Sequence, residues 1–289
     1  MRLGMMTETF KRYVSQEESL RLIKELGFDV ADITLFKTGD FTKPDPDIFD
    51  GDYILRAKQI KEYADEIGLP IIQSHAPFPV HIEGNEEYNK YIMDILSKCI
   101  EVCGILGVKN LVIHPWNNWN YKENAIFFRK LLPLAKKHNV IICTENMWNW
   151  DHEENHAIEA ACSSPEDFLR HIEEVNDDYL KACVDVGHAN MMSVVSKTTT
   201  PGNMVRVLNK NINCFHIHDN DGVHDSHETP FTMNLDWNDL AKAIKEINYQ
   251  GDLIIEICGI KDATLEETIK RNKLQVEAGH KLINLIKNS

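Results

Sequence analysis

The sequence predicts a (β/α)8 barrel, or TIM barrel, an α/β fold that we expect to form a single domain over residues 1–289. Eight short apolar runs alternate with helical patterns from end to end, as expected for strands that are buried on both faces of a parallel sheet. No linker, low-complexity tract or shift in composition divides the chain. A doubly wound open sheet is the structural competitor, but it would normally have fewer strands and a glycine-rich first turn, which "GMMTETF" lacks.

The eight expected strands are short and apolar, and helical patterns separate them along the chain. They are "LGMM" (3–6), "VADITL" (30–35), "PIIQSH" (70–75), "NLVIH" (110–114), "VIICTE" (140–145), "KACVDV" (181–186), "CFHIH" (214–218) and "LIIEI" (253–257).

The helices expected between the strands carry ordinary start and stop signals. The clearest runs from Glu86 to Leu106, where apolar residues recur on one face, and the segments Tyr53 to Ile67 and Ser19 to Leu26 behave similarly. Ser164 is expected to cap a helix that begins at Pro165. Three glycines are expected just after helix ends: Gly27, Gly68 and Gly107.

The charge balance and the cysteines limit the class of protein. The formal net charge of −14, from 31 basic and 45 acidic residues, works against non-specific binding of a phosphate backbone and argues against nucleic acid as a partner. Seven scattered cysteines without a CxxC pair indicate a reduced chain. No apolar segment precedes a cleavage site, and no stretch approaches about 18 consecutive apolar residues. We therefore expect a soluble, cytoplasmic protein without membrane association.

Polar residues end six of the expected strands in step. They are His75, His114, Glu145, Asp185, His216 and Glu256, at successive spacings of 39, 31, 40, 31 and 40 residues. Each spacing is about one βα unit, so all six side chains are expected at one height around the C-terminal mouth of the barrel. The longest non-helical stretches also follow strands and are expected at the same mouth: 36–52, 115–121, 146–163 and 219–236.

These six side chains predict a metal site. Two glutamates, an aspartate and several histidines cannot stay ionised together in a water-poor mouth without a counter-charge, which a divalent cation supplies. The mixed oxygen and imidazole donors suit manganese, zinc, cobalt or iron. Because no cysteine pair converges there, we do not expect thiolate ligands. A single histidine at a strand end is more often structural, so the inference depends on the six residues as a set.

Seven motifs carry a family resemblance over nearly the whole chain. They are "SHAPF" (74–78), "VIHPW" (112–116), "CTENM" (143–147), "VDVGHAN" (184–190), "FHIHDND" (215–221), "HDSH" (224–227) and "LIIEI" (253–257). They resemble the xylose isomerase-like barrel superfamily, in the branch of sugar-phosphate isomerases and epimerases that also includes the type IV apurinic endonucleases.

The resemblance implies a metal-dependent sugar or sugar-phosphate isomerase or epimerase with one divalent metal, Mn²⁺, Zn²⁺ or Co²⁺. Carried over by position, the metal ligands are Glu145, Asp185, His216 and Glu256. Glu145 and Glu256 would also take and return a proton beside the substrate carbonyl, and His188 would contact a substrate hydroxyl. Epimerases of the tagatose type carry an arginine six residues after the metal histidine, where this chain has Gly222. The match to that subgroup is therefore incomplete.

The same resemblance carries an alternative, a multi-zinc phosphodiesterase that acts on abasic DNA like the type IV apurinic endonucleases. Those enzymes hold additional Zn²⁺ with an Asp-x-His pair and the histidine of D-x-x-H, and with two further histidines and a shared glutamate. The matching sets here are Asp225, His227 and His188, and His75, His114 and Glu145. The net charge and the lack of a basic stripe in the loops argue against DNA.

Aromatic residues in the strand-following loops fit a small polyol, whose C–H faces can pack on them. They are Trp116, Trp119, Trp148, Trp150 and Phe78. The residues expected to contact the sugar are His188, His75, His114, Trp116, His218, Asp225 and His227. His218 is expected to lie nearer the solvent than His216, where it would either support a metal ligand or contact the substrate. Residues 219–222 are expected to form a turn with local Asx hydrogen bonds.

Three further expectations complete the interpretation. A non-catalytic carbohydrate-binding barrel is a third possibility, but it would have no need of a facing pair of glutamates. The resemblance implies a homo-oligomer, either a dimer or a tetramer. A basic cluster near the C-terminus is expected to be a solvated helix face: Lys270, Arg271 and Lys273.

Overall fold

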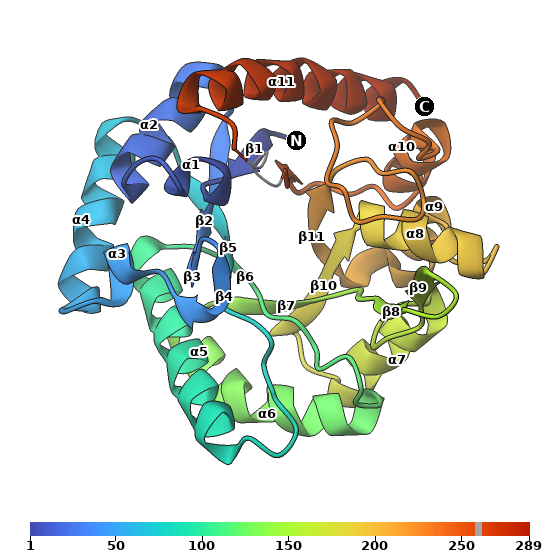
Figure 1. Cartoon of the computed structure of the whole chain (residues 1–289), viewed down its shortest axis with the longest axis horizontal. Coiled ribbons are helices and arrows are strands. Elements are labelled where there is room, and N and C mark those ends of the chain that lie inside the picture. Colours follow the sequence, from blue (N-terminus) through green and yellow to red (C-terminus); the bar gives the residue numbers. More distant parts are fainter. Residues whose placement is uncertain (258–261) are drawn as a thin grey trace.

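The computed structural model describes residues 1–257 and 262–289, and its eight parallel strands close into a barrel. The order around the ring is β1-β12-β11-β10-β7-β6-β5-β2 (Figure 1). Each barrel strand therefore pairs with the barrel strands before and after it in the sequence, and β12 closes the ring onto β1. Their bounds are β1 (Leu3–Met6), β2 (Val30–Thr34), β5 (Ile71–His75), β6 (Asn110–Val112), β7 (Ile141–Glu145), β10 (Leu180–Asp185), β11 (Ile212–Ile217) and β12 (Leu253–Ile255). The predicted (β/α)8 barrel is confirmed.

Helices form the outer layer of the ring (Figure 1). They are α1 (Glu8–Lys11), α2 (Gln16–Leu26), α3 (Pro46–Phe49), α4 (Tyr53–Glu66), α5 (Glu86–Leu106), α6 (Tyr121–His138), α7 (Pro165–Val175), α8 (Val186–Val195), α9 (Pro201–Leu208), the 3-10 turn η1 (Asn209–Asn211), α10 (Trp237–Glu246) and α11 (Leu265–Asn288).

Most of the expected helix ends agree with the structure, although α2 begins at Gln16 and not at Ser19, and α4 ends at Glu66 and not at Ile67. The helix predicted from Glu86 to Leu106 is α5, with the same bounds. Ser164 caps α7, and its side chain accepts a hydrogen bond from the backbone N–H of Asp167. Gly27 and Gly107 follow α2 and α5 in the left-handed conformation, at φ of 99° and 75°, where glycine avoids the strain that a side chain would bring.

Two of the long loops contain regular structure that the sequence did not reveal. The stretch 36–52 forms the hairpin β3 (Phe36–Lys37) and β4 (Asp40–Pro44) and then α3, which contradicts its expected non-helical character. The stretch 146–163 contains the hairpin β8 (Asn149–Asp151) and β9 (His156–Ile158). Strands and helices this short give no periodic signal in a sequence.

Gly4 shows how closely the barrel interior is packed. A Cβ atom at this position would lie 2.5 Å from Cδ1 of Ile254 and 2.7 Å from Cγ2 of Val30. These two side chains come from β12 and β2, the strands on either side of β1. Glycine in "LGMM" therefore makes room for its neighbours inside the ring.

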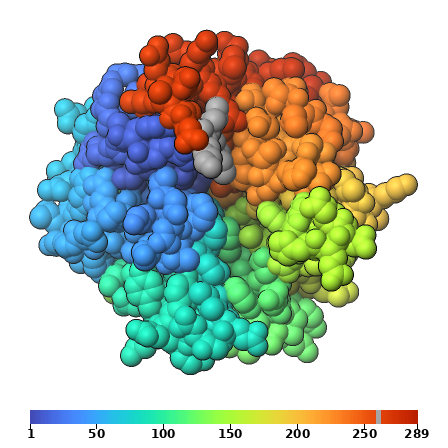
Figure 2. Space-filling model, viewed as in Figure 1, coloured from blue at the N-terminus to red at the C-terminus, as the bar shows by residue number. Residues whose placement is uncertain are grey.

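The C-terminal ends of the strands carry the long loops and both hairpins. Figure 2 shows the side chains of this face, where residues after β1 and after β11 approach the axis of the ring from opposite sides. Among the helices of the described residues, none combines the length and the apolar character needed to cross a membrane.

Candidate metal centre and its cavity

The ends of four neighbouring strands bring together the four residues expected to hold a metal. Glu145, Asp185 and His216 lie at the ends of β7, β10 and β11, and Glu256 directly follows β12. One ligand atom from each lies within 4.8 Å of the others. Nδ1 of His216 is the central atom, because it lies 3.2 Å from Oε1 of Glu145 and 3.2 Å from Oε2 of Glu256.

A second cluster consists of Glu145, His75 at the end of β5, and His114, which lies two residues after β6. Nε2 of His75 lies 3.0 Å from Nε2 of His114, and Nε2 of His114 lies 3.2 Å from Oε2 of Glu145. Nδ1 of His75 donates to the backbone carbonyl of Ala76 at 2.8 Å. That bond fixes the ring so that the lone pair of Nε2 faces His114 and Glu145.

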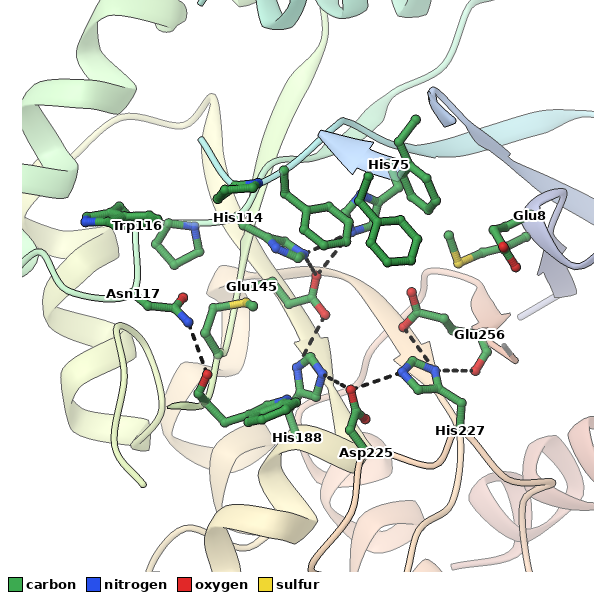
Figure 3. Close-up of a pocket in the computed structure, with 18 of the residues that line it drawn as sticks. Glu8, His75, His114, Trp116, Asn117, Glu145, His188, Asp225, His227 and Glu256 are labelled. Atoms are coloured by element: carbon green, nitrogen blue, oxygen red, sulfur yellow. Dashed lines mark hydrogen bonds and ion pairs between the residues drawn. The ribbon is translucent and has the colours of Figure 1, made fainter. Parts of the chain in front are cut away.

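A third cluster, of four residues, gathers on the opposite side of Glu145: His188, His218, Asp225 and His227. Nε2 of His188 and Nε2 of His227 each lie 3.3 Å from Oδ2 of Asp225 (Figure 3). Their Nδ1 atoms donate to backbone carbonyls, of Asn146 at 2.8 Å and of Glu256 at 3.0 Å. Both rings are therefore held with Nε2 toward the carboxylate.

The donor set fits divalent cations. Oε2 of Glu145 and Oδ1 of Asp225 are buried and accept no hydrogen bond from the described residues. Buried carboxylate oxygens without a donor are costly unless a cation compensates them. Three histidines present Nε2 to the clusters while a backbone carbonyl holds Nδ1, which is the usual arrangement of a metal-ligating imidazole. The oxygen and nitrogen donors suit zinc, manganese, cobalt or iron.

The two glutamates of the first cluster differ in acidity. Burial alone would raise the pKa of Glu145, but His216, His114 and His75 outweigh burial and hold that pKa well below the usual value. Burial dominates at Glu256 and raises its pKa, although His216 and His227 oppose the rise. Carboxyls whose environments push their pKa values apart are suited to opposite roles in proton transfer.

The histidines also differ in charge. Burial disfavours the charged ring of His188, but Asp185, Asp225 and Glu145 raise the pKa of His188 to about 10. Burial lowers the pKa of His114 to about 4, although Glu145 opposes the change. His114 is therefore a neutral donor at pH 7, whereas His188 carries a proton beside Asp225 unless a cation replaces it.

His218 is not where the sequence suggested. It is completely buried, its ring stacks on His227 with the centroids 3.9 Å apart, and its Nε2 lies 3.0 Å from both carboxylate oxygens of Asp185. The expectation that it lies toward solvent is wrong because the chain after β11 folds back over it, with Asp219 pairing with Glu228. His218 contacts Asp185 and is not among the residues that line the cavity.

The turn that follows His218 has the expected local hydrogen bonds. Oδ1 of Asn220 accepts from the N–H of Gly222 at 2.9 Å, and Oδ1 of Asp221 accepts from the N–H of Val223 at 2.8 Å. Gly222 has a φ of 81°, in the left-handed region that favours glycine. Position 222 therefore has a backbone conformation that suits glycine, where the tagatose-type epimerases carry an arginine.

A cavity of about 450 Å³ adjoins the clusters, and both polar and aromatic side chains line it. The expected aromatics that line it are Phe78, Trp116 and Trp148; Trp119 and Trp150 are not among the lining residues. Lining residues that were not predicted from the sequence include Met6, Glu8, Phe36, Phe41, Asn117 and Met147. Phe36 and Phe41 belong to the unexpected β3–β4 hairpin, and Phe41 stacks on Phe78 with the ring centroids 4.9 Å apart.

One thiol lies closer to the clusters than expected. Cys183 offers its Sγ within 4.8 Å of ligand atoms of Glu145 and His216. Burial raises the pKa of Cys183 well above its usual value, which keeps the sulfur protonated and makes it a poor ligand. Cys258 lies outside the described residues.

In the basic cluster of α11, Lys270 and Lys273 are exposed, whereas Arg271 is partly buried and pairs with Glu228 at 2.9 Å.

Similarity to known proteins covers most of the chain. Residues 20–278 match the family model described as xylose isomerase-like TIM barrel. The uncharacterized protein MJ1311 of Methanocaldococcus jannaschii is 26% identical over 251 residues, which are 79% of each chain. A protein of Metamycoplasma arthritidis named probable endonuclease 4 is 28% identical over 134 residues, which are 45% of this chain and 46% of that protein.

Solved structures with the same fold include proteins named for sugar chemistry. A D-tagatose 3-epimerase-like protein is 22% identical, with a TM-score of 0.74 over 98% of this chain and 99% of that chain. The IOLI protein, whose structure contains a bound zinc atom, is 19% identical, with a TM-score of 0.76 and the same coverage. At these identities the likeness establishes the fold. By its match to the family model, the chain belongs to the xylose isomerase-like TIM barrel family.

Proposed function

We propose that this protein is a metal-dependent sugar isomerase or epimerase that abstracts a proton next to a carbonyl. One observation carries the proposal. Glu145 and Glu256 converge on the same nitrogen of His216 from different strands, at 3.2 Å each, beneath an aromatic-walled cavity. Two carboxyls that flank one point, with pKa values shifted in opposite directions, suit removal of a proton from one side and its return from another. The epimerase names of structurally similar proteins support the same chemistry.

Each side chain has a role in this proposal. Glu145, Asp185, His216 and Glu256 would hold one divalent cation, which polarises a substrate carbonyl when bound. Glu145 and Glu256 take and return the proton. His188, held by Asn146 and Asp225, donates to a substrate hydroxyl. His75, His114 and Trp116 contact the remaining sugar, while Phe36, Phe78 and Trp148 exclude water.

Deuterium exchange tests the proposal. Chelator-treated protein is reloaded with Mn²⁺, Co²⁺ or Zn²⁺ and incubated with a panel of ketoses in D₂O, and incorporation beside the carbonyl is followed by NMR. We expect exchange with at least one sugar, and a loss of about 10²–10⁴-fold in Glu256→Gln, the range typical of a removed general base. A non-catalytic binding protein would bind sugar and exchange nothing. The exposed Glu153→Gln is the matched control and should keep full activity.

A second function has its own support. The first two ligand clusters share Glu145, and Nδ1 of His188 in the third cluster lies 3.7 Å from Oε1 of Glu145, so the three clusters adjoin one another. Such a set could hold several Zn²⁺ ions and serve a phosphodiesterase, in line with the partial match to a probable endonuclease 4. Cleavage of a duplex with one abasic site by zinc-loaded protein, without any ketose exchange, would favour this second function.

A further inference from the structure

One acidic side chain on the cavity wall belongs to none of the ligand clusters. Glu8 is the first residue of α1, and only 12% of its side chain is exposed. It lines the cavity together with Glu256 and His227 and lies on the same side as Glu256 in Figure 3. Its Oε1 lies 3.8 Å from Nη2 of Arg12, and its carboxylate accepts no hydrogen bond from the described residues. A buried acceptor that faces a cavity without a donor is a site for a ligand's donor group.

The backbone around Glu8 is tied to its neighbours by the two threonines that flank it. Oγ1 of Thr7 accepts from the N–H of Thr34 at 3.0 Å, and the N–H of Glu8 donates to Oγ1 of Thr34 at 3.1 Å. Oγ1 of Thr9 donates to the carbonyl of Ile257 at 2.8 Å. The turn is thus attached to β2 on one side and to the chain after β12 on the other. These bonds hold the backbone of Glu8 in place, as is required of a side chain that recognises a substrate.

The other lining residues decide what Glu8 can bind. Among the described residues that line the cavity, four are acids and none is lysine or arginine; the acids are Glu8, Glu145, Asp225 and Glu256. A single divalent cation offsets two of these four charges, the proton on His188 offsets a third, and Arg12 lies 3.8 Å from Glu8. Without a lysine or arginine in its lining, the wall has no strong donor for a phosphate group, whereas its carboxylates accept hydrogen bonds from the hydroxyls of a neutral polyol.

We infer that Glu8 is a specificity-determining residue that accepts a hydrogen bond from a hydroxyl of a neutral polyol and thereby disfavours phosphorylated sugars. The inference rests on the proposed isomerase or epimerase function. The aromatic rings of Phe36, Phe78 and Trp116 cover the C–H face of such a substrate, which leaves its hydroxyl edge for Glu8.

The test compares wild type, Glu8→Gln and Glu153→Gln, each as the full chain loaded with Mn²⁺. Glu153 is exposed beside β8, so Glu153→Gln removes the same charge away from the cavity. Two quantities are measured: KM and kcat for a ketose that exchanges deuterium, and Kd for the matching alditol, which binds without reacting. We expect Glu8→Gln to raise KM and Kd about tenfold or more, with kcat changed less, because a charged acceptor is lost. Glu153→Gln should match wild type.

The outcomes separate the two proposals. Unchanged KM and Kd in Glu8→Gln would overturn the role of Glu8, and so would a wild type that turns over a ketose phosphate faster than the free ketose. If the alditol binds but no ketose exchanges deuterium, the proposed reaction fails while the alditol Kd still decides the role of Glu8. If the wild type binds no alditol, both proposals fail. Glu8→Asp keeps the charge and retracts it by one methylene, so weaker alditol binding by this folded variant also supports the role.

Discussion

Asp32 lies behind the candidate metal ligand His216, with Oδ2 of Asp32 4.0 Å from Nε2 of His216 and both side chains completely buried. Neither carboxylate oxygen of Asp32 accepts a hydrogen bond from the described residues. Nε2 of His216 also has no hydrogen-bond partner among them. Nδ1 of the same ring faces Glu145 and Glu256. A negative charge on the far side of a ligating imidazole strengthens the ring as a donor to a cation.

We expect Asp32→Asn to weaken the binding of Mn²⁺ or Zn²⁺ by about 10–100-fold, the usual cost of removing a carboxylate that supports a metal-ligating histidine. Competition with a chelating dye measures the affinity without reference to activity. Asp29→Asn is the matched control, since Asp29 precedes β2 and bonds to the N–H of Leu3 at the other end of the barrel. Equal losses in the two variants would rule out a specific effect of Asp32 on His216.

The same substitution should change stability with pH. Burial raises the pKa of Asp32 to about 6, although His216 and His75 oppose the rise, against about 3.9 in an unfolded chain. A carboxyl with a raised folded pKa holds its proton more tightly in the native state, so the native state loses stability as the pH rises from about 4 through about 6. In chelator, Asp32→Asn should therefore be about 2–3 kcal/mol more stable than wild type at pH 7 and equally stable at pH 4. Urea unfolding at both pH values measures this, and a difference that does not vary with pH would exclude the charge as its cause.

Gly187 leaves the space that His218 occupies. A Cβ atom at Gly187 would lie 1.9 Å from Cε1 of His218, whose Nε2 contacts Asp185. We expect Gly187→Ala to displace His218, to lower stability by about 1–3 kcal/mol through overpacking, and to weaken cation binding because Asp185 loses its support. Ala189→Gly in the same helix should cost about 1 kcal/mol by helix propensity and leave cation affinity unchanged. Undiminished cation binding by Gly187→Ala would show that His218 does not position Asp185.

Two tryptophans three residues apart make a matched pair. Trp116 lines the cavity, whereas Trp119 packs against His81 and Phe127. Trp116→Leu should raise KM for the sugar by about 3–10-fold through lost stacking, and Trp119→Leu should lower the melting temperature with KM unchanged. Steady-state kinetics below the melting temperature of both variants decide the point. A similar KM for the two variants would contradict the placement of Trp116, and not Trp119, against the substrate.

The sequence predicts what depends on local pattern. The run "LGMM" is β1 with the same bounds, and α5 has the expected ends, because apolar runs, caps and helical stripes are local signals. Residues that end strands could be placed at one mouth because a ring closed by parallel strands fixes their height. Glu8, Asp32 and Phe36 were missed because their importance comes from which side chain each meets across the ring. His218 was misplaced because nothing local predicts that the chain folds back over it.

The number of cations per chain distinguishes the two candidate functions. The first cluster, of Glu145, Asp185, His216 and Glu256, carries three carboxylates, so it should bind a cation first. Once Glu145 is engaged there, His75 and His114 are left as two imidazoles without a carboxylate of their own. A cation has to displace a proton at either cluster, from His216 at the first and from His188 at the third, but the third cluster offers only one carboxylate, Asp225.

We therefore expect elemental mass spectrometry of the dialysed protein to give about one metal per chain. Asp185→Asn should reduce that ratio, because it removes a ligand of the first cluster only. His114→Asn should leave the ratio at one and raise KM for the sugar. A ratio near three that falls to two in His114→Asn would show that the pair of His75 and His114 holds a metal of its own. The excess positive charge of three cations would then offset the acids around the cavity, which is the condition under which a phosphodiester can bind.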